Sequence, residues 1–141
     1  MKMCIIYWSG TGNTEAMANL ICEGAVSTGA DVLLKEVAAA SAADVETADI
    51  AVFGCPAMGD EILEEDEFEP FMQSVAGALS GRKVGLFGSY DWGDGEWMRL
   101  WEDDVKKAGA VLLKDGLIVN LEPAGDDVEN CRNFGKELAG M

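Results

Sequence analysis

Runs of apolar residues alternate along the chain with segments in which apolar side chains recur every three or four positions. Strands of a sheet covered on both faces are apolar without alternation, whereas a helix packed on a sheet is apolar on one side only. The apolar runs predict five strands, the last of them interrupted at Asp115-Gly116. The strands are Met3–Trp8, Val32–Lys35, Ile50–Gly54, Val84–Gly88, and Ala110–Leu113 with Leu117–Val119.

The segments with helical spacing predict four helices, which follow the first, third, fourth and last strands. They are Met17–Gly24, Phe68–Leu79, Trp97–Ala108 and Val128–Ala139. The Ala-rich segment Val37–Thr47 has room for a short helical turn. This alternation is typical of an α/β domain, here a three-layer sandwich on a parallel sheet in the order 2-1-3-4-5. We expect residues 1–141 to form a single domain with a ligand at the carboxyl ends of strands 1, 3 and 4.

The charge and the composition of the chain exclude several classes of function. The chain has 10 Lys and Arg, 26 Asp and Glu and no histidine, which gives a net charge of −16. A surface this acidic repels nucleic acid and anionic membranes and favours partner proteins with basic surfaces. Without histidine there is no Ser-His-Asp triad, no histidine-bound zinc and no histidine-ligated haem. The sequence predicts no catalytic side chain.

The cysteines and the apolar stretches indicate where the protein works. The four cysteines lie too far apart for a metal site, and we expect free thiols, which suit the reducing cytoplasm. They are Cys4, Cys22, Cys55 and Cys131. No stretch approaches the ~20 apolar residues that would span a membrane. The sequence therefore predicts a cytoplasmic protein without a bound metal.

The turn after the first strand has the composition of an anion site. Ser9-Gly10-Thr11-Gly12-Asn13-Thr14 leads directly into a helix, so that its amide and hydroxyl groups converge near the helix N-terminus. It holds no Lys or Arg, it lacks the Gly-Lys-Ser/Thr of a P-loop, and Glu15 stands where a dinucleotide-binding turn has glycine. These features favour one terminal phosphate over a nucleoside triphosphate or NAD.

Two further loops are expected at the same edge of the sheet, and each carries a large apolar side chain. The segment Cys55–Glu61 presents Met58, and the segment Ser89–Gly95 presents Trp92. A flat ring fits between them, since stacking on an indole contributes about 0.5–1.5 kcal/mol beyond the area it buries.

These motifs resemble those of a short-chain flavodoxin of the type found in anaerobic bacteria. The similarity rests on three segments in family order and spacing, and it runs from end to end of the chain. They are Tyr7–Glu15, Gly54–Glu61, and Leu86–Tyr90 with Trp92–Gly95. The resemblance implies bound FMN and a low-potential one-electron carrier that cycles between semiquinone and hydroquinone and substitutes for ferredoxin. It also implies ferredoxin-type donors and acceptors as partners, and we expect a monomer.

The resemblance also assigns roles to individual residues. The turn Ser9–Thr14 becomes the phosphate cradle, Met58 and Trp92 the walls of the ring site, and Ser89 a contact to the ribityl chain or phosphate. Glu61 is expected to accept a hydrogen bond from the ring N3–H, and the carbonyl of Gly59 to turn toward a protonated N5. The expected cofactor contacts are Ser9, Gly10, Thr11, Gly12, Asn13, Thr14, Ala57, Met58, Gly59, Asp60, Glu61, Ser89, Tyr90, Asp91, Trp92 and Gly93.

Two features leave alternatives open. Asp91 stands where similar flavodoxins usually have glycine, and it adds a negative charge close to the ring. The acidic run Asp60–Glu69 is either a solvated loop and helix start or a surface that steers basic partners and opposes a second negative charge on the flavin. The same fold also serves FMN-dependent NAD(P)H:quinone or flavin reductases, but the chain lacks added loops for nicotinamide. A receiver domain would need an Asp at the end of the third strand, where Cys55 stands.

Overall fold

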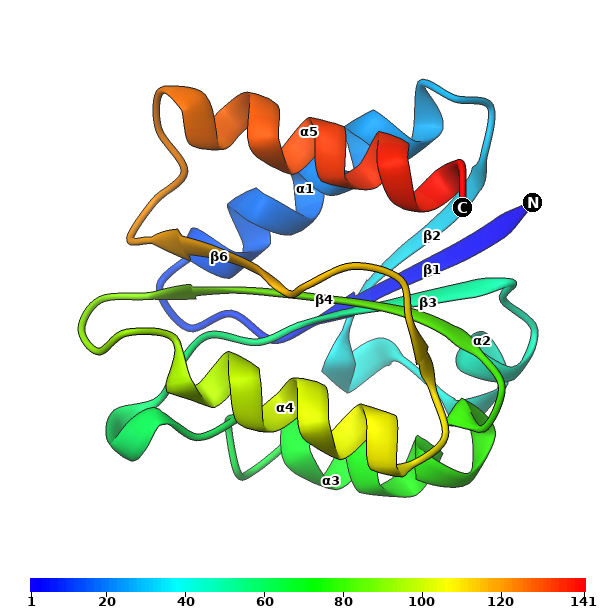
Figure 1. The fold of residues 1–141 in the computed structure, drawn as a ribbon, viewed down its shortest axis with the longest axis horizontal. Helices are drawn as coiled ribbons and strands as arrows, with labels where there is room; N and C mark the ends of the chain where they lie inside the picture. Colours follow the sequence, from blue (N-terminus) through cyan, green and yellow to red (C-terminus); the bar gives the residue numbers. More distant parts are fainter.

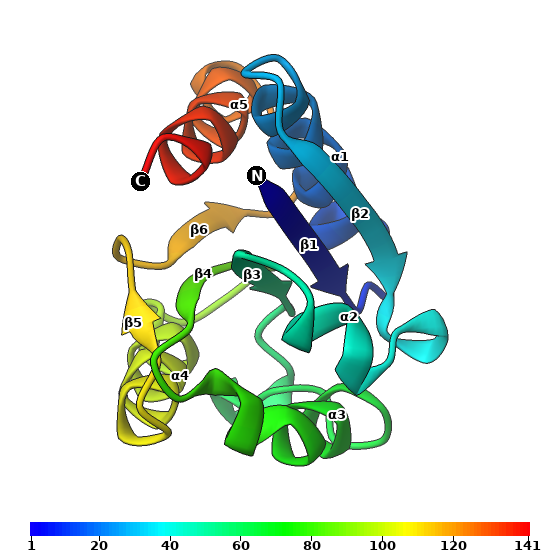
Figure 2. The same ribbon diagram turned by 90° about the vertical axis from the view of Figure 1, so that its right-hand side faces the viewer.

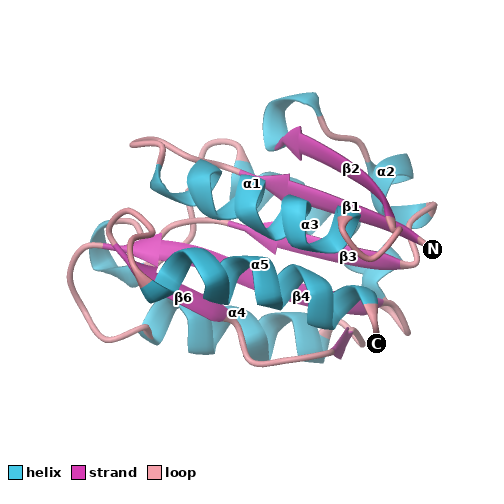
Figure 3. Ribbon diagram, turned by 90° about the horizontal axis from the view of Figure 1, so that it is seen from above, coloured by secondary structure: helices cyan, strands magenta, loops and turns pink.

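The computed structural model describes residues 1–141, except for the side chain of Asp60. Its centre is a parallel sheet in the strand order β2-β1-β3-β4-β5, with β6 paired to β4 beyond the end of β5 (Figures 1 and 3). This is the order that the sequence predicts. The strands are β1 Lys2–Tyr7, β2 Asp31–Glu36, β3 Ile50–Gly54, β4 Lys83–Tyr90, β5 Val111–Leu112 and β6 Leu117–Asn120.

Helices cover both faces of the sheet, which makes the three layers expected from the sequence. Figures 1 and 2 show α1 and α5 together on one face, and α3 and α4 together on the other. The helices are α1 Asn13–Val26, α2 Ala42–Glu46, α3 Phe68–Val75, α4 Glu96–Lys107 and α5 Asp126–Ala139. Short 3-10 turns lie at η1 Val37–Ala39, η2 Gly59–Glu61 and η3 Ala76–Leu79.

The first strand shows how the two cores are built. Successive side chains of a strand point to opposite faces of the sheet. Met3 and Ile5 therefore pack with α1 and α5, while Cys4 and Ile6 join the core beneath α3 and α4. All four are buried, so the prediction of strands that are apolar on both faces is confirmed for β1. The edge strand β2 is only partly covered, and Leu33 is exposed.

The structure corrects several predicted bounds, among them those of the fourth strand and of the second predicted helix. β4 continues through Ser89 and Tyr90, which the sequence assigns to the following loop, because β6 pairs with both residues. The predicted helix Phe68–Leu79 ends as α3 at Val75 and continues as the 3-10 turn η3. Gly77 lies in that turn, and glycine costs about 1 kcal/mol in a helix interior, which favours the break. The Ala-rich segment Val37–Thr47 holds η1 and α2.

Helices α1 and α5 approach each other closely through two glycines. A Cβ on Gly24 would lie 1.9 Å from the carbonyl oxygen of Arg132, and one on Gly135 would lie 2.1 Å from that of Ile21. The two glycines therefore allow backbone to pack on backbone, and this contact holds the last helix in place over β4 and β6.

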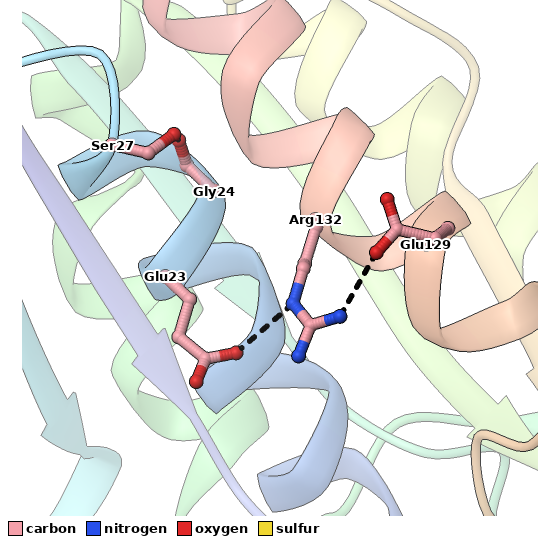
Figure 4. A network of polar contacts seen from close by, with 5 residues as sticks. All are labelled: Glu23, Gly24, Ser27, Glu129 and Arg132. Carbon is pink, nitrogen blue, oxygen red and sulfur yellow. Dashed lines mark hydrogen bonds and ion pairs between the residues drawn. The ribbon is translucent and has the colours of Figure 1, made fainter.

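Charged side chains border this helix contact (Figure 4). The guanidinium of Arg132 on α5 donates to Glu23 on α1 at 3.3 Å and to Glu129 on its own helix at 2.9 Å. The Ser27 hydroxyl donates to the carbonyl oxygen of Gly24 at 2.6 Å near the end of α1. Exposed ion pairs contribute only about 0–1 kcal/mol, so these pairs add little to the stability of the interface.

The four cysteines form no disulfide, as the sequence predicts. All four cysteines are free, and Cys22 alone among them is partly exposed. Within the part of the chain that the structure describes, no group of three or more metal-ligating side chains is found, and no helix is long and apolar enough to cross a membrane.

Candidate functional site

Three loops meet at the carboxyl ends of β1, β3 and β4, and they surround a cavity of about 270 Å³. The cavity opens at the point where the strand order reverses between β1 and β3. Its lining comes from all three loops: Trp8, Gly10, Thr11 and Asn13 after β1, Pro56–Gly59 after β3, and Ser89–Trp92 at the end of β4. The three motifs found in the sequence therefore converge on a single site.

Most of the predicted contact residues line this cavity directly. Those that do are Gly10, Thr11, Asn13, Ala57, Met58, Gly59, Ser89, Tyr90, Asp91 and Trp92. Ser9, Gly12 and Thr14 complete the first loop without lining the cavity, and Glu61 and Gly93 lie together beside it. The side chain of Asp60 is outside the described part of the chain.

The sequence analysis missed two lining residues, Trp8 and Pro56. Trp8 belongs to the apolar run of the first predicted strand, and this pattern predicts a buried core residue. The structure ends β1 at Tyr7 and places Trp8 on the loop, half-buried. A Cβ on Gly10 would lie 2.9 Å from the Trp8 ring, so glycine lets the loop pass over the indole. The indole N–H donates to Glu67 at 3.3 Å, which ties the loop to the acidic run.

The first loop is shaped by its own hydrogen bonds. The Ser9 hydroxyl oxygen accepts the amides of Gly12 and Glu15, both at 3.2 Å. Gly12 precedes α1 with φ 96, a left-handed conformation that favours glycine. The first turn of a helix leaves amides without intrahelical acceptors, and these amides and the partial positive charge of the helix end suit an anion.

A buried pair of hydroxyl groups joins this loop to β4. Thr14 and Ser89 are almost completely buried, and their hydroxyl oxygens lie 2.8 Å apart. The Ser89 amide also donates to the Thr14 hydroxyl at 3.4 Å. Since one hydroxyl donates to the other, one O–H hydrogen of the pair remains for a ligand, and Ser89 lines the cavity.

The loop after β3 is a tight turn that returns on itself. The Met58 amide donates to the carbonyl of Ile62, and the Glu61 amide donates to the carbonyl of Met58, both at 2.9 Å. Glu61 has φ 51, which is uncommon for a residue with a side chain. Gly59, by contrast, has no heavy atom within 4 Å of an added Cβ. The turn as observed does not require glycine at position 59.

The Glu61 carboxylate has one oxygen that could accept a hydrogen bond from a ligand. Its Oε1 is buried and has no hydrogen-bond partner among the described residues. It lies against Gly93, where a Cβ would come within 2.2 Å of it. A buried acceptor without a donor costs about 1–3 kcal/mol, which a ligand N–H at this position would recover.

The loop after β4 presents its aromatic side chain to solvent. Trp92 is 60% exposed, which leaves its ring face open for stacking. Asp91 is exposed as well and has no positive φ, so the backbone at this position does not require glycine. Tyr90 packs on Trp97 with ring centroids 5.8 Å apart. Met58 and Trp92 line the same cavity as expected.

The lining of the cavity is made of neutral polar and apolar side chains together with one carboxylate, that of Asp91. None of the described lining residues is Lys, Arg or Cys. Burial raises the pKa of the nearby Cys55 thiol to about 12, which keeps it protonated and inert at neutral pH. A neutral donor set, an unpaired carboxylate oxygen and two apolar walls instead fit a planar phosphate-bearing cofactor such as FMN.

Glu64, in the acidic run Asp60–Glu69, is neither a solvated side chain nor part of a surface that could steer partners. Glu64 is 6% exposed, and its side chain accepts the amides of Asp66, Glu67 and Phe68 at 2.8, 2.7 and 2.8 Å. Burial by itself would raise the pKa of Glu64, but these three N–H donors lower it below its ordinary value. Glu64 is therefore a structural cap on the start of α3, whereas Glu65 and Asp66 are exposed.

We expect Glu64→Gln to lower the free energy of unfolding at pH 7 by about 1–2 kcal/mol, because the charged acceptor is lost. A lowered folded-state pKa gives stability that is present above the unfolded pKa of about 4.3 and is lost as the pH falls through the folded value. The difference from wild type should therefore shrink below about pH 4. Urea unfolding across this pH range measures it, with exposed Glu65→Gln as the control. An equal effect of both variants would contradict the capping role.

The fold and the site together define a flavodoxin-like α/β protein with a cavity at the strand-order reversal. The flavodoxin family model matches residues 5–135. The flavodoxin of Clostridium beijerinckii is 49% identical over 140 residues, covering 99% of this chain and 100% of that protein. The flavodoxin of Megasphaera elsdenii is 46% identical over 135 residues, with 96% of each chain covered.

Solved structures agree with these sequences. The solution structure of two-electron reduced Megasphaera elsdenii flavodoxin superposes with a TM-score of 0.91 at 45% identity, covering 99% of each chain. Oxidised flavodoxin 1 of Bacillus cereus gives a TM-score of 0.88 at 29% identity, covering 100% of this chain and 99% of that one. The chain belongs to the flavodoxin family, whose members are FMN-binding electron carriers.

Proposed function

We propose that this chain is a low-potential one-electron carrier that works in the cytoplasm as a monomer, in place of ferredoxin, and has no substrate of its own. When bound, FMN supplies reversible one-electron chemistry, here between its semiquinone and hydroquinone levels. The observation that carries the proposal is the cavity, which has neutral phosphate donors on one loop, two apolar walls on the others, and the unpaired Glu61 oxygen beside it.

Different residues around the cavity would bind the phosphate, the ribityl chain and the ring of FMN. The turn Ser9–Thr14 would bind the phosphate through amides and hydroxyls, and Ser89 would reach the ribityl chain or the phosphate. Met58 and Trp92 would flank the ring. Ala57, Asp60, Tyr90, Asp91 and Gly93 remain predicted contacts in the two loops around it. The Glu61 carboxylate would accept a hydrogen bond from the ring N3–H. The Gly59 carbonyl would accept one from N5 when N5 is protonated.

Negative charge around the site would set the direction of the potentials. Asp91 lines the cavity, Glu61 lies beside it, and the whole chain carries −16. Carboxylates close to the ring oppose the addition of a second negative charge to the flavin, which lowers the second one-electron potential. The same field favours redox partners that dock through basic surfaces.

The test of the proposal begins with the purified full chain. We expect a yellow protein with a flavin spectrum that releases FMN, and not FAD, in a one-to-one ratio on denaturation. Steady oxidation of NADH or NADPH by the purified protein alone should be absent. A protein that carries no flavin after incubation with FMN would overturn the proposal, and sustained NAD(P)H oxidation would favour a reductase instead.

Gly59→Ala should lower the first one-electron potential by tens of millivolts. A Cβ restricts the backbone conformations through which the residue 59 carbonyl can turn toward N5. Each 1.4 kcal/mol lost in this way corresponds to about 59 mV for a one-electron couple. Because an added Cβ meets open space in the observed turn, the variant should fold and bind FMN normally.

A spectroelectrochemical titration measures both potentials of the Gly59 variant, with Gly77→Ala as the control. Gly77 lies in η3 and likewise has open space around an added Cβ. An unchanged first potential together with a shifted second potential would count against the role of the Gly59 carbonyl.

A further inference from the structure

A second hollow region is lined by residues of α3, α4 and the segment before α3. These two helices lie on the face of the sheet opposite α1 and α5 (Figure 2). It consists of two adjoining cavities of about 310 and 240 Å³. The cavities share four lining residues and so form one continuous feature, which we call the α3–α4 groove. The shared residues are Leu63, Glu69, Trp101 and Asp104.

The groove combines apolar surface with carboxylates. Leu63 and Trp101 line both cavities, and Leu100 lines the first, where its side chain is 52% exposed. Glu69 and Asp104 border both cavities. Among the described residues that line the groove there is no Lys or Arg, so none of these carboxylates has a basic neighbour within the lining. Apolar side chains surrounded by charge of one sign fit an occupant of complementary pattern.

The groove reaches the flavin site through Glu61. This residue lines the first cavity, and its carboxylate lies against Gly93 in the loop that carries Trp92. A partner seated between α3 and α4 would therefore be held next to the loops that surround the flavin cavity. Short separation is what electron transfer between two proteins requires.

We propose that the α3–α4 groove docks an amphipathic helix of a redox partner, a helix whose apolar stripe is bordered by Lys and Arg. The apolar stripe would cover the exposed Leu100 and the partly exposed Leu63, above the buried ring of Trp101, and the basic residues would pair with Glu69 and Asp104. The redox nature of the partner rests on the proposed function, whereas its shape and charge rest on the groove itself.

Charge complementarity distinguishes this occupant from two others. A second copy of the chain would bring another surface of the same sign, since each copy carries −16. An anionic membrane would be repelled for the same reason. A basic helix would instead reduce the electrostatic repulsion among the carboxylates and would bury the exposed side chain of Leu100.

The test uses the FMN-loaded full chain and an amidated lysine–leucine peptide of about 18 residues, with leucines at helical spacing. A peptide of the same composition in scrambled order, without helical spacing, is the control. We expect saturable binding of the first peptide at low ionic strength, at least about tenfold tighter than that of the scrambled peptide. The shifted amide resonances should cluster at 62–69 and 97–105.

The indole N–H of Trp101 provides a specific reporter. Trp101 is 2% exposed, and its Nε1 has no hydrogen-bond partner among the described residues. Its resonance should move on peptide binding, while that of Trp8, which donates to Glu67, should move much less.

Variants separate the apolar and the charged contributions. Leu100→Ser should weaken binding of the helical peptide about tenfold at every salt concentration, because apolar contact is lost. The control Val26→Ser removes an equally exposed apolar side chain, 52%, from α1. Glu69→Gln with Asp104→Asn should weaken binding about tenfold at low salt and much less at high salt. Its control, Asp31→Asn with Glu46→Gln, removes the same charge from two exposed positions outside the groove.

The outcomes separate this inference from the proposed function. If the chain binds FMN but the helical and scrambled peptides bind equally, or the shifts spread over the whole acidic surface, the groove is not the docking site and the carrier function stands. Equal effects of the groove variants and their controls would overturn the inference as well. If the chain binds no FMN, the carrier function fails, while peptide binding to the groove is still measurable.

Discussion

Gly135→Ala is expected to lower the free energy of unfolding by about 3 kcal/mol, even though alanine is the better helix former. The added Cβ would lie 2.1 Å from the carbonyl oxygen of Ile21 and 3.0 Å from the amide nitrogen of Ala25. Both are backbone atoms of α1, which cannot rotate away as a side chain would. Helices α1 and α5 must therefore separate, and Phe134 and Leu138 must leave their positions in the core between α5 and the sheet.

Urea unfolding at fixed FMN concentration measures this effect, since bound FMN itself stabilises the native state. Gly24→Ala should behave similarly, because its Cβ would lie 1.9 Å from the Arg132 carbonyl oxygen. Gly77→Ala, where the added Cβ has open space, should change stability by less than about 1 kcal/mol. If the variants at 24 and 135 were as stable as the one at 77, the backbones of α1 and α5 would not be in the close contact described here.

The arrangement of the sheet could be predicted from the sequence because its signals are local and consistent. β1 and β3 are apolar at every central position, as strands covered on both faces must be, and each is followed by a loop rich in glycine or small residues. Right-handed crossovers then leave few possible strand orders. The same reasoning placed three loops at one edge, and the cavity is lined by residues from all three.

The misassigned details depend on contacts between distant segments. Ser89 and Tyr90 look like loop residues, but β6 extends β4 by pairing with them. Glu64 is one of seven carboxylates in a run of ten residues, and nothing nearby in sequence marks it as buried. It is buried because the chain turns so that three amides at the start of α3 meet its carboxylate. Polar side chains that satisfy backbone groups are difficult to distinguish from solvated ones by pattern alone.

Removing hydroxyls from the phosphate loop should weaken FMN binding selectively. Thr11→Val with Thr14→Val keeps the side-chain shape but removes two hydroxyl groups from the predicted cradle. Hydrogen bonds to a charged group contribute about 1.5–3 kcal/mol each, so we expect FMN affinity to fall about 100-fold. Riboflavin, which lacks the phosphate, should bind with less than about threefold change. Fluorescence titration of the apoprotein with each flavin measures both affinities.

The single variants locate the origin of this loss. Thr11 is exposed and lines the cavity, so Thr11→Val should weaken FMN binding about tenfold without affecting stability. Thr14 is buried and paired with Ser89 at 2.8 Å, so Thr14→Val should also lower the urea midpoint, because the Ser89 amide and hydroxyl lose a partner. Thr28→Val, whose hydroxyl donates to Ala25 just beyond the other end of α1, is the matched control and should leave both flavin affinities unchanged. Equal losses for FMN and riboflavin in the Thr11 variant would show that the loop holds the ring or the ribityl chain, and the phosphate would then have to bind elsewhere.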